Sequence, residues 1–142
     1  MNGIKVYMMK EKVELLNDIS KNTLVENIGI VFTASGEDWL EARMPIDSRT
    51  CRPDGALHGG ANMALAETVG GALSTMLQPE GERFRVFGIE VNGNHVKQAR
   101  GTSVTARGYF LHRGRRTQVV QVEIRDEYGT LVTINRVTNM VV

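Results

Sequence analysis

Apolar residues follow a helical period in two segments of the 142-residue chain. Residues 58–77 read HGGANMALAETVGGALSTML, so almost every position is small or apolar, and a helix of this kind must be covered on most sides. Residues 10–21 show a weaker helical pattern, with Val13, Leu16 and Ile19 on one face. We expect a short helix in an N-terminal lead-in of about 27 residues, followed later by one long central helix.

Alternation of apolar and polar residues predicts strands in the rest of the chain. Turns near residues 36–38, 113–116 and 127–130 are short enough for antiparallel hairpins. The expected strands span residues 28–35, 39–46, 84–98, 102–112, 117–126 and 131–142. A strongly curved antiparallel sheet is the economical way to cover a long apolar helix, so the pattern predicts an α+β architecture with the sheet around the helix.

Length and composition fit one folded domain over residues 1–142. Hydrophobic residues make up 42% of the chain and charged residues 23%, which are ordinary globular values. No run approaches the ~18 apolar residues of a membrane span, and the first residues lack the pattern of a secretory leader. Cys51 is the only cysteine, which excludes an internal disulfide and favours a reducing environment. We therefore expect a cytoplasmic protein that has no membrane contact.

Positive charge is concentrated in one segment of the sequence. Residues 91–122 hold six of the 17 Lys and Arg residues and no Asp or Glu, which leaves 11 basic against 16 acidic residues elsewhere. Such a local excess suits a compact anion, for example a phosphorylated small molecule, better than nucleic acid, which normally needs a broader basic surface. The alternative is that some of these side chains are simply solvated strand and turn positions.

Glu67 is the only carboxylate in the apolar segment 58–77. A charge inside so apolar a helix costs free energy unless it is paired or hydrogen-bonded, because it loses its hydration. Glu67 is therefore the first candidate for chemistry. The alternative is a carboxylate that only satisfies donors at a subunit interface.

Three motifs in order identify a resemblance to a known family. They are LHGGANMALAE at residues 57–67, GIEVNGNHV at residues 88–96 and HRGRRTQVVQVEIRDEYG at residues 112–129. Together they resemble the hotdog-fold acyl-CoA thioesterases, in the group of the 1,4-dihydroxy-2-naphthoyl-CoA, 4-hydroxybenzoyl-CoA and phenylacetate-pathway enzymes, over about residues 41–142. The resemblance implies a hotdog fold, a curved antiparallel sheet wrapped around one central helix. It also implies hydrolysis of acyl-CoA thioesters that carry aromatic or other compact acyl groups.

The central helix carries the two groups that this chemistry needs. Gly59 and Gly60 lie where the helix begins, and the free N–H groups there, reinforced by the helix dipole, can hold a carbonyl oxygen that gains negative charge. Glu67 is eight residues further on, about 12 Å at ~1.5 Å per residue, so one carbonyl cannot touch both groups in a single chain. Antiparallel packing of two central helices across a two-fold axis would bring them together. We therefore expect a homodimer with active sites at the subunit interface, as in the resembled enzymes, and a dimer of such dimers.

The roles of Glu67 and His58 stay open at this point. Glu67 either removes a proton from water or attacks the thioester directly to give a mixed anhydride. His58 is expected to shape the helix start through a hydrogen bond to a neighbouring backbone group. The alternatives for His58 are help in positioning the thioester and a purely structural role at the helix entry.

The resemblance also implies which residues contact the bound acyl-CoA. These residues are Gly88, His95, Val96, Lys97, Gln98, His112, Arg113, Gly114, Arg115, Arg116 and Thr117. Basic side chains among them would pair with the phosphates of coenzyme A, and Gly114 would let the backbone of a tight turn approach the ligand. Coenzyme A enters as part of the substrate, so we expect no separate cofactor and no metal.

Two positions depart from the family pattern. Enzymes of this type often carry Gln seven residues before the oxyanion glycine, where this chain has Arg52, and Ser or Thr one helical turn after the acid, where it has Gly71. Arg52 either donates to a carbonyl of the substrate or pairs with Glu67 and lowers its basicity. Thr68 and Ser74 are candidates for the missing hydroxyl, although neither lies at the same offset.

Two other functions remain open. One is a hotdog-fold lyase that hydrates or dehydrates an acyl thioester, although such enzymes usually pair a catalytic His with a helix acid in a different local pattern from HGG. The other is a non-catalytic acyl-CoA-binding module or sensor. A sensor coupled to DNA would normally add a helix-turn-helix, and the residues before Ile28 hold at most one good helix, so no nucleic-acid partner is expected.

Overall fold

A six-stranded antiparallel sheet forms the frame of the molecule, and the computed structural model describes residues 3–79 and 85–142. The strands are ordered β1-β2-β4-β5-β6-β3, and every neighbouring pair is antiparallel. In chain order the elements are α1 (Gly3–Ile19), α2 (Leu24–Asn27), β1 (Val31–Ser35), β2 (Trp39–Pro45), α3 (Gly59–Met76), β3 (Val86–His95), β4 (Ser103–Arg113), β5 (Thr117–Asp126) and β6 (Leu131–Val141).

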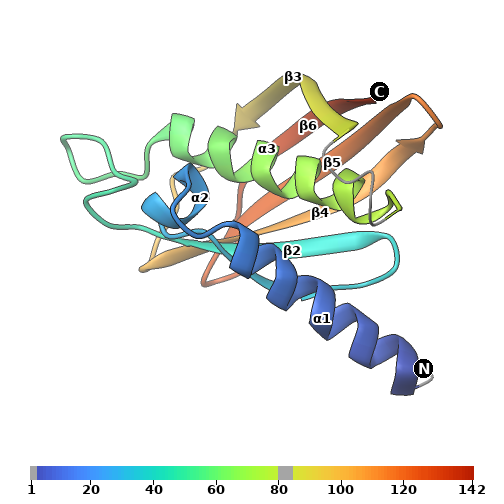
Figure 1. The fold of residues 1–142 in the computed structure, drawn as a ribbon. Coiled ribbons are helices and arrows are strands. Elements are labelled where there is room, and N and C mark those ends of the chain that lie inside the picture. The colour runs from blue at the N-terminus through green and yellow to red at the C-terminus, as the bar shows by residue number, and fades with distance from the viewer. Residues whose placement is uncertain (1–2, 80–84) are drawn as a thin grey trace.

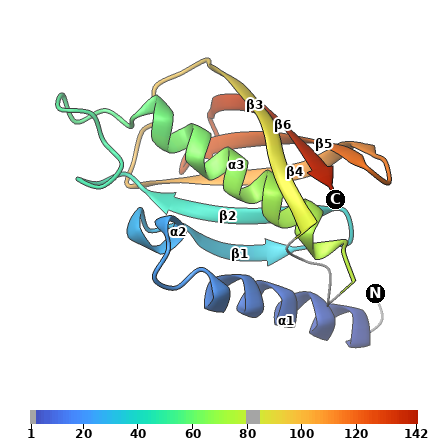
Figure 2. The same cartoon turned by 45° about the horizontal axis from the view of Figure 1, so that its top comes forward.

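Helix α3 lies on one face of the sheet, which bends around it (Figures 1 and 2). The helix contacts strands β2, β3, β4, β5 and β6. Val69 and Leu73 of α3 pack with Ala106, Val122 and Val137 of the sheet in the fully buried core. Because the apolar helix is covered by the inward-facing residues of five strands, the predicted sheet-around-helix architecture is confirmed.

The two edges of the sheet differ. At one edge α1 lies beside β1, and Asn17 forms two hydrogen bonds with the backbone of Phe32, donating to its oxygen at 2.9 Å and accepting from its nitrogen at 2.8 Å. At the other edge β3 lies across α3 with its outer side uncovered (Figure 2), and Phe87 and Ile89 are 54% and 53% exposed. An uncovered edge strand with large apolar residues invites pairing with another strand.

The prediction is least accurate in the N-terminal part. Helix α1 begins at Gly3, earlier than predicted, and the strand predicted from residue 28 begins only at Val31. Residues 24–27 instead form the single turn α2, with Thr23 as its N-cap, and Gly29 then reverses the chain at φ 75°. The lead-in thus holds two helices, although only one was expected.

The other predicted elements agree more closely with the structure. The central helix and the strands β2, β4, β5 and β6 begin and end within one residue of the prediction. Strand β3 ends at His95, three residues earlier than expected, and residue 84 lies outside the described residues. In the described part of the chain, no helix has the length and apolar character that crossing a membrane requires.

Candidate active site

The first turn of α3 leaves one backbone donor free. His58 is the N-cap, and its Nδ1 accepts a hydrogen bond from the Gly60 nitrogen at 2.8 Å, as expected for a residue that shapes the helix start. The carbonyl oxygen of His58 accepts from the nitrogens of Ala61 and Asn62. Among the described residues, the Gly59 N–H has no acceptor. Since the N-terminal end of a helix is also electropositive, the Gly59 N–H can bind an oxygen that gains negative charge.

A cleft of about 440 Å³ opens beside Gly59. Its lining includes six residues of the predicted site, namely Arg52, Gly59, His95, Val96, Lys97 and Gln98. A Cβ atom placed on Gly59 would come within 2.8 Å of His95 Nε2, so the glycine permits the imidazole to lie against the helix start. One half of the predicted site is therefore assembled around the free Gly59 amide.

Arg52 is occupied by an acid of its own loop. Its Nε lies 3.1 Å from Asp54 Oδ1, and a second nitrogen bonds the other carboxylate oxygen. The hydrogen bond from Arg52, assisted by the Ala56 backbone N–H, lowers the pKa of Asp54. Within one chain, Arg52 therefore pairs with Asp54 and not with Glu67, because Glu67 lies two helical turns further along α3.

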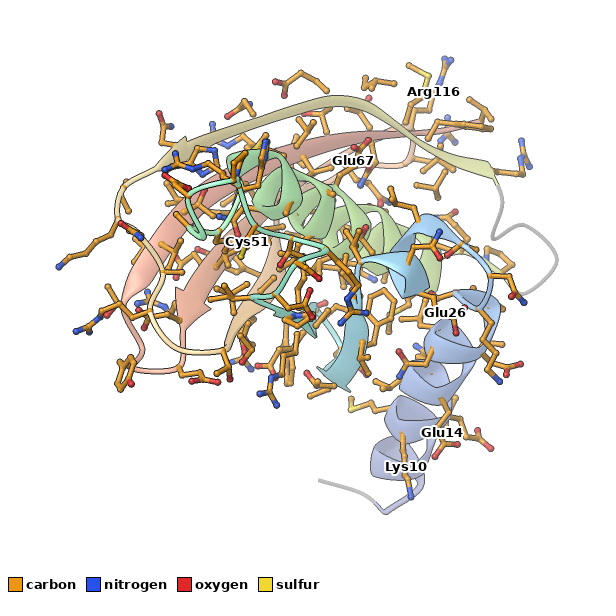
Figure 3. The ribbon with its side chains drawn as sticks, turned by 90° about the vertical axis from the view of Figure 1, so that its left-hand side faces the viewer. Lys10, Glu14, Glu26, Cys51, Glu67 and Arg116 are labelled. Atoms are coloured by element: carbon orange, nitrogen blue, oxygen red, sulfur yellow. The ribbon has the colours of Figure 1, made fainter. Side chains whose placement is uncertain are left out.

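Glu67 is exposed in the single chain and faces strand β3, as Figure 3 shows. A Cβ atom on Gly88 would come within 2.9 Å of Glu67 Oε1, so Gly88 leaves the room that this carboxylate occupies. Within the described residues, Glu67 forms no hydrogen bond and no ion pair. The sequence predicted an acid in apolar surroundings. The structure exposes it because the outer side of β3 is uncovered.

The remaining predicted residues lie at the Glu67 end of β3. Thr117, which follows the turn of the β4–β5 hairpin, pairs with Met140, and Met140 pairs with Phe87 at the start of β3. His112, Arg113, Gly114, Arg115 and Arg116 belong to this hairpin. Gly88 and His95 are seven residues apart, about 23 Å in an extended strand, so one chain holds the predicted site as two separate clusters.

The basic segment 91–122 does not form a single patch. Arg107 stacks on the Trp39 ring at 3.9 Å, Arg100 Nε lies 3.8 Å from an Asp126 oxygen, and Arg113 pairs with Asp38 at 2.8 Å. Antiparallel strands carry neighbouring residues to opposite ends and faces of the sheet, so the excess of positive charge in the sequence is divided among several places in the fold. Arg115 and Arg116, by contrast, have no acidic partner among the described residues.

Two buried amides near these clusters were not predicted. Asn62, 3% exposed, lines the cleft beside Gly59, and its Oδ1 has no hydrogen-bond partner in the described structure. Asn139, fully buried, pairs with Gly88 across β6 and β3, and its Oδ1 also lacks a partner. The sequence held a signal for both: Asn62 is a polar residue at an inward-facing position of an apolar helix, and Asn139 is one at an inward-facing position of an alternating strand.

The two clusters carry complementary chemistry. The Gly59 end presents a free amide donor with the cationic Lys97 in its cleft, and the Glu67 end presents an uncompensated carboxylate. Such a pair can polarise a carbonyl and deliver a nucleophile to it. Among residues 3–79 and 85–142, no three His, Cys, Asp or Glu side chains lie together as they would to hold a metal ion.

Known proteins are similar to this chain in sequence and in fold. The thioesterase superfamily matches residues 54–133, which include α3, β3 and the β4–β5 hairpin. The 1,4-dihydroxy-2-naphthoyl-CoA hydrolase of Escherichia coli is 43% identical over 136 residues, covering 96% of this chain and 98% of that enzyme. The crystal structure of a Haemophilus influenzae thioesterase has a TM-score of 0.87 at 42% identity, covering 92% of this chain and 90% of that one. A Bacillus halodurans protein solved with CoA has a TM-score of 0.67 at 26% identity, covering 72% and 66%.

Proposed function

The chain belongs to the thioesterase superfamily, and we propose that it hydrolyses acyl-CoA thioesters to a carboxylic acid and coenzyme A. A relative that acts on a CoA ester and a structural neighbour solved with CoA support this substrate class. An aromatic or other compact acyl group is favoured because the Escherichia coli relative is a hydrolase of a naphthoyl ester.

One observation carries the proposal: the two half-sites lie at opposite ends of the same uncovered strand. Glu67 faces Gly88, and the Gly59 end of α3 lies against His95. Antiparallel pairing of two β3 edges, centred between Val91 and Asn92, would set Gly88 opposite His95 of the partner subunit. Glu67 would then face the partner subunit's Gly59. The homodimer thus completes two equivalent sites, one on each side of the two-fold axis.

The uncovered edge supports this assembly. The exposed Phe87 and Ile89 of β3 would be removed from water when two such edges pair, and the free backbone groups of the strand would be satisfied. At the opposite edge, α1 lies beside β1, and Asn17 already bonds the backbone nitrogen and oxygen of Phe32.

In the reaction, the Gly59 N–H of one subunit binds the thioester carbonyl oxygen, and the positive end of α3 stabilises the charge that develops there. His58 holds the neighbouring Gly60 N–H and thereby fixes the helix start. Glu67 of the other subunit acts as general base on water or as nucleophile. The C–S bond then breaks and coenzyme A leaves as the thiol.

The coenzyme would extend from this site toward the basic side chains. Lys97 in the cleft of one subunit and the free Arg115 and Arg116 of the other subunit's hairpin would meet at the same end of the paired strands. Their charges suit the phosphates of coenzyme A.

A thiol-release assay tests the proposal. Benzoyl-, phenylacetyl- and hexanoyl-CoA are compared as substrates of wild type and of Glu67→Gln. The expected result is release of thiol by wild type and a loss of kcat of more than ~100-fold in Glu67→Gln, because a positioned base or nucleophile is removed without a change of shape. Glu14→Gln on α1, an exposed helical glutamate remote from the clusters, should retain full activity.

Other outcomes separate the alternatives. A hydratase or dehydratase would alter the acyl group without releasing thiol, and a binding module would retain the ester unchanged. Equal thiol release by wild type and Glu67→Gln would contradict the assignment of the acid.

A further inference from the structure

Asn139 has a fixed orientation beneath α3. It lies on the inner face of β6, and its Nδ2 donates to the Gly70 oxygen at 3.0 Å and to Ser74 Oγ at 2.8 Å. A backbone carbonyl oxygen can only accept, so the Nδ2 atom must face the helix and the Oδ1 atom must point away from it. Side chain and helix together therefore hold one amide oxygen in a defined direction.

That oxygen is buried and has no hydrogen-bond partner in the described residues. A buried acceptor without a donor costs free energy, and such atoms in proteins usually have a water molecule or a functional role. The amide of Asn135 on the same strand face differs. Its Nδ2 donates to the Val122 oxygen, and its Oδ1 accepts from the Thr133 hydroxyl.

The free oxygen of Asn139 points to the place that Glu67 also faces. A Cβ atom on Gly88 would lie 3.7 Å from Asn139 Oδ1 and 2.9 Å from Glu67 Oε1. The two oxygens thus lie around one small space above Gly88, no farther apart than the sum of those distances. Two acceptors cannot bond to each other, but a single water molecule has two protons and can donate one to each.

We propose that Asn139 Oδ1 and the Glu67 carboxylate together hold the water that attacks the thioester. This inference rests on the proposed function. One proton of the water moves to Glu67 as the water oxygen bonds to the carbonyl carbon, and the other remains directed at Asn139 Oδ1. The C–S bond then breaks, and the thiolate sulfur takes the proton back from Glu67. The products are the carboxylic acid and the thiol, and Glu67 is a general base.

The surroundings of Gly71 and Ser74 agree with this role. Gly71, one turn after Glu67, has no side chain that could bind the water, and the space around the position of a Cβ there is open. Ser74 is buried and accepts from Asn139 Nδ2, so it is a positioning residue that acts through the amide. The Ser74 hydroxyl, which the sequence suggested as a replacement for the missing one, thus does not bind the water itself but holds the amide that does.

The test compares Asn139→Leu with Asn135→Leu. Both replace a buried amide on the inner face of β6 by an apolar side chain of similar size, but only Asn139 borders Glu67. With benzoyl-CoA, or with whichever panel ester turns over fastest, Asn139→Leu should lose kcat on the order of 100-fold with KM little changed, because the water is no longer aligned. Folded Asn135→Leu should keep kcat within about twofold.

A single-turnover measurement tests whether water attacks before the C–S bond breaks. With enzyme in excess, release of the thiol and release of the acid are followed separately. In Asn139→Leu both should slow by the same factor, because water attack precedes C–S cleavage. A preserved rapid release of thiol with slow release of acid would overturn the inference, since it would mean that Glu67 attacks first and water later.

The outcomes also separate this inference from the proposed function. If wild type releases no thiol from any ester, both the proposed function and the role of Asn139 are contradicted. Active wild type, inactive Glu67→Gln and a folded Asn139→Leu with full kcat would overturn the role of Asn139 alone. If Asn139→Leu fails to fold, Ser74→Ala decides: it removes one of the two hydrogen bonds that hold the amide and should lower kcat about tenfold, and unchanged kcat would overturn the inference.

Discussion

The two ends of strand β3 differ in the chemistry that they offer. At the His95 end, the start of α3 presents a free Gly59 donor beside a cleft of about 440 Å³. At the Gly88 end, the same helix presents the Glu67 carboxylate, and β6 adds the free amide oxygen of Asn139, so that two acceptors lie there. Hydrolysis of a thioester needs a donor for the carbonyl and an acceptor for the proton of water. Each end therefore supplies half of a site.

The distance between the halves explains why both are needed from different chains. Gly59 and Glu67 are about 12 Å apart along a continuous helix, at ~1.5 Å per residue. A helix is too stiff to close that distance. A two-fold axis, by contrast, would bring the Gly59 end of one subunit to the Glu67 end of the other. The proposed reaction therefore requires that two subunits pair.

Complementation between two inactive subunits tests most directly whether the two ends act together across the subunit interface. Gly59→Val blocks the amide and displaces His95, and Glu67→Gln removes the acid, so each homodimer should retain less than ~1% of wild-type kcat. A heterodimer, co-expressed with two affinity tags and purified through both, has one site with both groups intact. Its activity per dimer should be about half that of wild type. The measurement is thiol release.

The control for complementation is a heterodimer of Glu67→Gln with the double variant Gly59→Val/Glu67→Gln. It is assembled and purified in the same way, but every site lacks the acid, so it should stay inactive. A Glu67→Gln and Gly59→Val heterodimer as inactive as its parents would show that donor and acid act within one chain.

The sequence predicted these two ends unequally well. Gly59, His58 and Glu67 could be proposed from the sequence because a helix start and a lone acid in an apolar helix are local features. Arg113 was predicted as a coenzyme ligand, but Asp38, remote in sequence, pairs with it. Such a partner depends on which strands meet, and local pattern does not contain that information.

Asn139 shows the same limit more clearly. Its sequence position indicates only a polar residue in an alternating strand. Its role depends on three elements, since β6 carries it, α3 fixes its amide and β3 brings Gly88 opposite to it. In the order β5-β6-β3, β3 pairs with β6 although the two strands are far apart in the sequence. The hairpin turns alone do not predict this pairing.

Removal of the free arginines tests whether the Glu67 end binds the phosphates of coenzyme A. Arg115→Ala and Arg116→Ala should each raise KM for the acyl-CoA roughly three- to tenfold with little change in kcat, because each removes a charge that binds phosphate and leaves the reacting groups in place. Arg107→Ala is the matched control, since Arg107 stacks on Trp39 away from the clusters. An unchanged KM in both hairpin variants would remove them from the coenzyme site.

At the Gly59 end, the smallest expected effect concerns Asp54. Asp54→Asn releases Arg52 from its ion pair at the mouth of the cleft, and the freed positive charge should lower KM for the acyl-CoA about twofold. Arg52 lowers the pKa of Asp54, so in wild type this carboxylate stays ionised even at pH values below its ordinary pKa, and the ratio of the two KM values should be constant from about pH 5 to 8. Asp47→Asn is the control, because Asp47 pairs with Arg49 in the same loop outside this cleft. A ratio that changes across this pH range, or an equal effect of Asp47→Asn, would mean that Arg52 acts through the general charge of the loop and not within the cleft.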